Sequence, residues 1–194
     1  MLSLSDPERA AVLHLAREAV TQAVVHGHLP TDIPSDGIFS QPCGVFVTLH
    51  VANLLRGCIG VVEPSEPFGE SVVRCAASAA LQDPRFPVLR PQELSGLQIE
   101  ISLLSPPLLI RHEQIEIGRH GLLIKRGQQR GLLLPQVAVE HRFTVEQFLA
   151  ETCRKAQLPA QAWRDADVGI FGFTCQVFAD GPLPDGVSAH EKMD

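Results

Sequence analysis

The sequence lacks the cysteine spacings of a zinc site or of a disulfide framework. Its five cysteines are odd in number, widely separated and without a Cys-x-x-Cys pair: Cys43, Cys58, Cys75, Cys153 and Cys175. They also form no cluster with histidine at ligand spacing, so we expect neither a bound metal nor a tightly bound cofactor. The pattern indicates reduced thiols in a reducing compartment.

Long apolar runs and an excess of positive charge are missing too. No stretch approaches 18 uninterrupted apolar residues, and the first ten residues include Asp6, Glu8 and Arg9 instead of a basic flank and an apolar core. We therefore expect a cytoplasmic protein without a membrane segment. The formal net charge of -6 argues against nucleic acid as a partner. Four cations between residues 119 and 130 are interpreted first as a solvated strand face and second as an anion or partner surface.

Common catalytic and cofactor-binding motifs are also absent. The sequence has no Walker loop, no Gly-x-Gly-x-x-Gly, no Gly-x-Ser-x-Gly elbow and no Cys-x-x-x-Cys-x-x-Cys of a radical SAM cluster. Any cofactor would therefore have to come from a partner.

Helix signals occur at three places. Capping boxes and proline start the predicted helices, and glycine or an Asp-Pro pair stops them. The helices run from the Ser5 cap to Gly27, from Pro67 to the Asp83-Pro84 stop, and from the Thr144 cap to about Lys155.

Alternating apolar and polar residues predict antiparallel strands. Residues 45–51 alternate clearly, and a turn near Asn53 would fold residues 55–60 back against them. Further strands are expected at residues 97–103, 113–117, 122–126, 132–134 and, as one final strand, 168–178. Helices at both ends with hairpins between them predict an α+β fold, a mainly antiparallel sheet flanked by helices. We take residues 1–180 as one domain and residues 181–194 as a flexible tail.

The chemistry of the chain is concentrated in Leu55-Arg56-Gly57-Cys58-Ile59-Gly60. Alternation on a strand would place Arg56 and Cys58 on one face, about 6 to 7 Å apart. Arg56 could then lower the pKa of Cys58 and make it a nucleophile. The alternative is that Cys58 is a small core residue.

Arg56 has two further interpretations. Its planar guanidinium could hold a carboxylate or phosphate, or it could pair internally with Glu100 or Asp83. Asp83 and Arg85 follow a helix end, where they either fix the turn or contact a substrate.

Glu100 would join the site if it faced Arg56, and is otherwise a solvated strand residue. A general base for Cys58 could come from His50 or from His120 in the Gly-Arg-His-Gly turn. The sequence does not place either one, so it defines no triad.

The Leu55–Gly60 hexapeptide resembles the signature of the AMMECR domain family, known in bacteria and archaea as protein A of the AmmeMemoRadiSam system. Other blocks follow in the family's order over residues 7–178. They are Asp83-Pro84-Arg85-Phe86, Ile99-Glu100-Ile101-Ser102-Leu103-Leu104-Ser105, Gly118-Arg119-His120-Gly121-Leu122, Leu133-Leu134-Pro135-Gln136-Val137-Ala138, and Phe148-Leu149 with Cys153-Arg154-Lys155-Ala156. The chain departs from the usual pattern at residues 51–54, before the signature.

The resemblance implies two intimately packed lobes, of which the larger carries the signature. It also implies partnership with a Memo-like protein and a radical SAM protein. Two functional hypotheses follow. In the first, a pocket around Arg56 and Cys58 holds a small anionic substrate or modified group, with Glu100, His120, Asp83 and Arg85 as further binding residues. In the second, the chain is a non-catalytic binding or scaffold module whose signature is structural.

Overall fold

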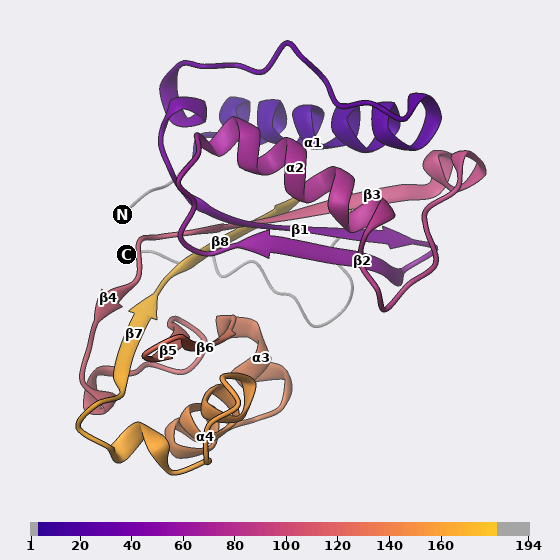
Figure 1. The fold of residues 1–194 in the computed structure, drawn as a ribbon. Helices are drawn as coiled ribbons and strands as arrows, with labels where there is room; N and C mark the ends of the chain where they lie inside the picture. Colours follow the sequence, from indigo (N-terminus) through magenta and orange to yellow (C-terminus); the bar gives the residue numbers. More distant parts are fainter. Residues whose placement is uncertain (1–3, 182–194) are drawn as a thin grey trace. The chain divides into compact units, whose positions relative to one another are not determined.

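The structure is a computed structural model that describes residues 4–181. Helices combine with two four-stranded antiparallel sheets (Figure 1), which confirms the predicted α+β class. The chain divides into two compact units. The first comprises residues up to Leu104 and resumes at Gln176, and the second is Ser105–Cys175. Residues 182–194, most of the predicted tail, lie outside the described part of the chain.

The first unit is a sheet covered on one face by two helices. Its strand order is β2-β1-β3-β8, so β2 is an edge strand. Helices α1 and α2 pack against each other and lie together over the sheet (Figure 1). Apolar residues of α1, α2, β1 and β3 form the core between them. The elements are α1 (Asp6–His26), η1 (Gly37–Ser40), β1 (Gly44–Val51), β2 (Leu54–Val61), α2 (Phe68–Leu81), η2 (Pro91–Gly96), β3 (Leu97–Leu104) and β8 (Cys175–Ala179).

The predicted start and stop of α1 are confirmed. The Ser5 backbone N–H donates to the Glu8 carboxylate, as in one half of a capping box, and the Ser5 hydroxyl donates to the same carboxylate. Gly27 ends the helix in the left-handed region, with φ of 72°. Residues close in sequence therefore determine where this helix begins and ends.

The β1–β2 hairpin is the element that carries the signature, as the alternation predicted. Val51 pairs with Leu54 across a two-residue turn in which Ala52 and Asn53 have φ of 51° and 62°. Two positive φ values give the turn the twist that suits a tight hairpin. The pairing shifts between Leu49 and His50, which leaves Arg56 as the extra residue of a β-bulge.

The second unit places a four-stranded sheet beside two helices. Its strand order is β4-β7-β5-β6, and its core joins β5 to α4 through buried apolar residues. Gln147 N–H donates to the Thr144 hydroxyl at the start of α4, as predicted. The elements are β4 (Leu108–Leu109), η3 (His112–Gln114), β5 (Gly121–Arg126), β6 (Gln129–Leu133), α3 (Pro135–Glu140), α4 (Val145–Lys155), η4 (Ala162–Arg164) and β7 (Gly169–Phe173).

Two strand predictions are wrong. Residues 113–117 form η3 and a turn, because Gln114, Ile115 and His120 donate their N–H groups to carbonyls three or four residues earlier. The final strand is not one strand but two, which belong to different sheets. Thr174 separates the two strands, of which β7 belongs to the sheet of the second unit and β8 to the sheet of the first.

Candidate functional site

The first unit has a polar row of side chains on the sheet face opposite its helices. Cys58 pairs with Thr48, and Thr48 pairs with Glu100 on β3. Paired residues share a face, so the three side chains lie in a row across the sheet. The Thr48 hydroxyl donates to Cys58 Sγ at 3.3 Å, and Glu100 is buried. The structure thus places Cys58 and Glu100, both predicted site residues, in one row on this face of the sheet.

On the opposite face of β2, the backbone of Gly57 lies against α2. An added Cβ there would lie 2.0 Å from the backbone oxygen of Ala79, which means that α2 packs directly on the bare backbone of β2. Gly57 therefore sets the spacing between the signature strand and α2.

Asp83 and Arg85 clamp the free edge of β2 at Cys58. Asp83 accepts a hydrogen bond from the Cys58 N–H at 2.9 Å, and Arg85 Nη2 donates to the Cys58 carbonyl at 3.1 Å. Asp83 also accepts from Arg85 Nε at 2.9 Å and from Nη2 at 2.6 Å, and its side chain is only 2% exposed. The ion pair thereby satisfies backbone groups that would otherwise lack a neighbouring strand.

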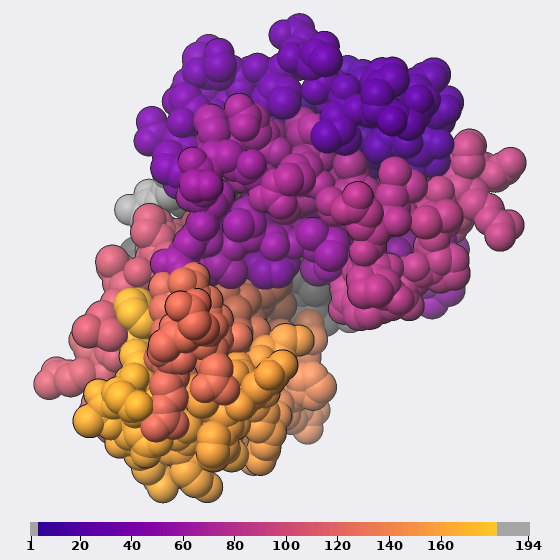
Figure 2. All heavy atoms as spheres, in the orientation of Figure 1, coloured from indigo at the N-terminus to yellow at the C-terminus, as the bar shows by residue number. Residues whose placement is uncertain are grey.

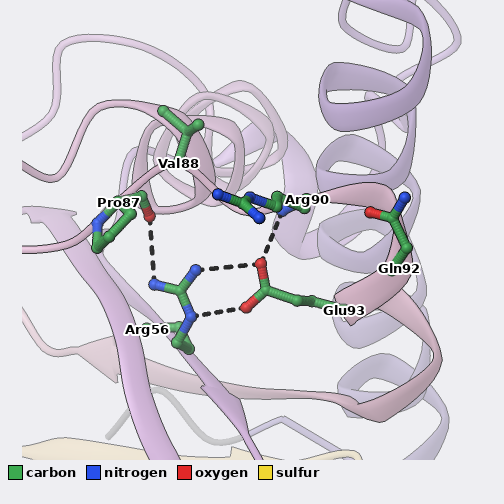
Figure 3. Close-up of a pocket in the computed structure, with 6 residues that line it drawn as sticks. All are labelled: Arg56, Pro87, Val88, Arg90, Gln92 and Glu93. Atoms are coloured by element: carbon green, nitrogen blue, oxygen red, sulfur yellow. Dashed lines mark hydrogen bonds and ion pairs between the residues drawn. The ribbon is translucent and has the colours of Figure 1, made fainter.

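Arg56 is held elsewhere, by the segment that follows α2. Its Nε and Nη2 donate to the two carboxylate oxygens of Glu93 at 2.8 and 3.2 Å, and Nη1 donates to the Pro87 carbonyl at 3.2 Å (Figure 3). The internal partner is therefore Glu93, and neither Glu100 nor Asp83. The bulge interrupts the alternation on which the expected placement of Arg56 beside Cys58 depends.

The electrostatic environment favours the neutral thiol of Cys58. Burial raises the pKa of Cys58, and the charges of Glu100 and Asp83 act in the same direction. The Thr48 hydroxyl and the Arg85 guanidinium lower the pKa, but burial is the largest influence. Cys58 is therefore protonated at neutral pH, and the cation that acts on it is Arg85.

The two histidines considered as bases lie in different units. His50 follows Thr48 on the same face of β1 and pairs with Gln98 on β3, and burial lowers the pKa of its imidazole. His120 precedes β5 in the second unit, where its Nδ1 accepts from the Glu116 N–H at 3.1 Å and burial lowers its pKa. Within the described residues, the hydrogen-bond partner of Cys58 Sγ is the Thr48 hydroxyl.

A hollow of about 450 Å³ opens beside the Arg56–Glu93 pair (Figure 3). Its lining consists of Arg56, Pro87, Val88, Arg90, Gln92 and Glu93. Arg56 is the one predicted site residue in this lining. The segment after α2 that contributes the other residues lies at the surface (magenta to pink in Figure 2). Sequence analysis assigned no role to the other five lining residues, Glu93 included, because nothing in their spacing links them to Arg56.

Residues 4–181 contain no group of three or more His, Cys, Asp and Glu side chains that could hold a metal ion. Over the same range, no helix has the length and apolar character needed to cross a membrane.

The raised pKa of Cys58 predicts slow thiol chemistry. The rate of labelling by iodoacetamide should keep rising above pH 8.5, the ordinary thiol pKa, because little thiolate exists below it. Arg85→Gln should slow labelling further because it removes the cation that favours the thiolate. Arg56→Gln is the matched control and should leave the profile unchanged. Mass spectrometry of labelled peptides measures each cysteine, and rapid labelling of Cys58 at pH 7 would contradict the assignment.

The fold and site define an α+β protein with a clamped signature strand at the edge of the sheet in its first unit. The AMMECR1 family model matches residues 13–178, and the chain belongs to this family.

Archaeal relatives cover almost the whole chain. Protein TK0174 of Thermococcus kodakarensis is 41% identical over 194 residues, which are 93% of this chain and 94% of that protein. Protein MK0488 of Methanopyrus kandleri is 40% identical over 203 residues, or 97% of this chain and 98% of that protein. The crystal structure of the uncharacterized protein PH0010 from Pyrococcus horikoshii matches with a TM-score of 0.83 at 38% identity, covering 95% of this chain and 96% of that one.

Proposed function

We propose that this protein is a non-catalytic binding module and that its Leu55–Gly60 signature is structural. One observation carries the proposal: the reactive groups of the signature are engaged within the fold. Both carboxylate oxygens of Glu93 accept from Arg56, and the backbone of Cys58 is clamped by Asp83 and Arg85. A nucleophilic cysteine needs an available thiolate and an oriented base, whereas the Cys58 thiol has a raised pKa.

The docking surface in this proposal lies next to the hollow. Leu54, Leu55 and Val88 are 68%, 39% and 56% exposed. Leu55 directly precedes Arg56, and Val88 directly follows Pro87, whose carbonyl accepts from Arg56. We call Leu54, Leu55, Pro87, Val88, Arg90 and Gln92 the hairpin-tip surface. Exposed aliphatic side chains around an arginine are typical of protein interfaces.

The partners in this proposal are the Memo-like protein and the radical SAM protein that family membership suggests. A partner with its own cofactor would supply the chemistry, and this chain would position that partner or its substrate. The proposal therefore assigns binding energy to the hairpin-tip surface and stability to Gly57 and the clamped backbone of Cys58.

The test is binding of purified Memo-like and radical SAM proteins encoded in the same genome, measured by isothermal titration calorimetry. At least one should bind, and Val88→Glu and Leu54→Glu should each weaken it about tenfold or more, since a buried charge opposes docking. Leu108→Glu, at a 68% exposed leucine of the second unit, is the matched control and should bind like wild type.

Cys58→Ser separates the two functional hypotheses. If it remains folded by circular dichroism, it should bind the partner within about threefold of the wild-type affinity. Absence of binding by both proteins, or equal binding by wild type, Val88→Glu and Leu54→Glu, would overturn the proposal. A partner-dependent reaction that Cys58→Ser abolishes in a folded protein would favour a catalytic pocket.

A further inference from the structure

The hollow beside Arg56 has an excess of positive charge in an acidic protein. Two guanidinium groups, of Arg56 and Arg90, line it with one carboxylate, that of Glu93. The chain as a whole has a formal net charge of -6. A local cationic site on an anionic protein attracts negatively charged groups and opposes cationic ones.

Donors for an anion remain in this hollow. Arg90 donates its backbone N–H to Glu93 at 2.9 Å, and within residues 4–181 its guanidinium has no hydrogen-bond acceptor. Arg56 uses three of its five N–H groups on Glu93 and Pro87. Figure 3 shows the Arg90 side chain extending over the hollow on the side of the Arg56 guanidinium. Gln92 also lines the hollow.

Glu93 indicates which anion suits the site. Its carboxylate already forms the two-point contact with Arg56 that guanidinium geometry favours. The exposed Val88, which lines the same hollow, offers an apolar contact. A complementary segment therefore combines a carboxylate with a neighbouring aliphatic side chain.

We propose that the hollow receives an acidic side chain of the docked partner protein, with Arg90 as its main donor and Arg56 as the second. An aliphatic residue next to that acid contacts Val88. This inference rests on the proposed function and names the chemistry that the hairpin-tip surface recognises.

The experiment titrates the full-length protein with two capped dipeptides, N-acetyl-Leu-Glu-amide and N-acetyl-Leu-Gln-amide. Arginine Nε–Hε resonances report binding in two-dimensional NMR. We expect saturable shifts of the Arg90 and Arg56 resonances at millimolar concentrations of the Glu peptide. The affinity for the Gln peptide should be lower by about fivefold or more.

Variants identify the donors. Arg90→Gln should abolish the saturable shift of Arg56, whereas Arg164→Gln, at a 55% exposed arginine of the second unit, should leave binding unchanged. Glu93→Gln should strengthen binding several-fold because it removes the competing carboxylate. If Glu93→Gln does not fold, the Arg90→Gln comparison still decides.

Three outcomes would overturn the inference. These are equal binding of the two peptides, no saturable shift at about 50 mM peptide, or a much tighter response to inorganic phosphate than to the Glu peptide, which would indicate a small-anion site. Peptide binding without binding of either partner protein would leave the chemistry of the hollow standing and reject the named partners. If a partner protein binds and Arg90→Gln does not weaken that binding, the proposed function would stand and the assignment of the hollow would be rejected.

Discussion

Gly57→Ala should destabilise the protein by about 3 kcal/mol or more, which is a large effect for one methyl group. The added Cβ would lie 2.0 Å from the Ala79 oxygen and 2.9 Å from its carbonyl carbon. Both are backbone atoms of α2, so a side-chain rotation cannot relieve the clash. Either α2 or β2 must move, and the core between them loses its packing. For a chain of this size, the melting temperature should fall by about 6 to 12 °C.

Gly96→Ala provides the matched control. A Cβ at Gly96 would have Val51 Cγ1 as its nearest neighbour at 3.8 Å, an ordinary contact distance. We expect a change within about 0.5 kcal/mol for this variant. Thermal and urea unfolding of both variants measure the difference. A Gly57→Ala protein as stable as Gly96→Ala would show that α2 does not constrain the signature strand.

Asp83→Asn should cost about 2 to 4 kcal/mol at pH 7. The carboxylate accepts from the Cys58 N–H and from three N–H groups of Arg85 or its backbone, and it is nearly inaccessible to solvent. Hydrogen bonds to a charged group are the stronger class, and an amide cannot accept at both of its terminal atoms. Urea unfolding should therefore show a lower midpoint for the variant.

The same substitution should change the response to acid. The hydrogen bonds from Arg85 hold the pKa of Asp83 well below its usual range. A depressed folded-state pKa contributes stability that is present above the unfolded pKa, about 3.9, and is lost as pH falls toward the folded value. The stability difference between wild type and Asp83→Asn should therefore be constant from pH 7 to about 5 and shrink below about 4.

Glu116→Gln is the control for this prediction. The ion pair between Arg119 and Glu116 joins side chains that are 55% and 58% exposed, and such pairs contribute about 0 to 1 kcal/mol. If the two variants had similar stability at pH 7, the contacts of Asp83 and Arg85 with β2 would not contribute measurably to the stability of the fold.

The hairpin was predictable from the sequence, but the position of Arg56 on it was not. Residues 45–51 alternate over seven positions, and the pairing of β1 with β2 and β3 follows that pattern. The bulge depends on where the Ala52-Asn53 turn closes the hairpin, and turn geometry has no periodic signal. A single extra residue was enough to give Arg56 different neighbours from those expected.

Contacts within the site were predictable only where they are local. Asp83 and Arg85 are two residues apart after a helix end, and their pairing fits the turn-fixing interpretation. Glu93 reaches Arg56 across 37 positions of sequence through a proline-rich segment without periodicity. Burial, which decides the protonation state of Cys58, depends on tertiary packing and leaves no mark on the hexapeptide.

The order of strands along the chain has a consequence for synthesis. The second unit is an insertion between β3 and β8, and its two ends meet, since Ser105 N–H donates to the Thr174 carbonyl and Thr174 N–H to the Ser105 hydroxyl. Ribosomes release residues in order, so the inserted unit emerges in full while the sheet that surrounds it in sequence still lacks its last strand. Asp180, whose backbone N–H and carboxylate both bond to the backbone of Ile99, can close that sheet only after the second unit has been synthesised. A nascent chain halted before β8 would therefore contain all of the second unit, whereas the sheet of the first unit would lack one strand.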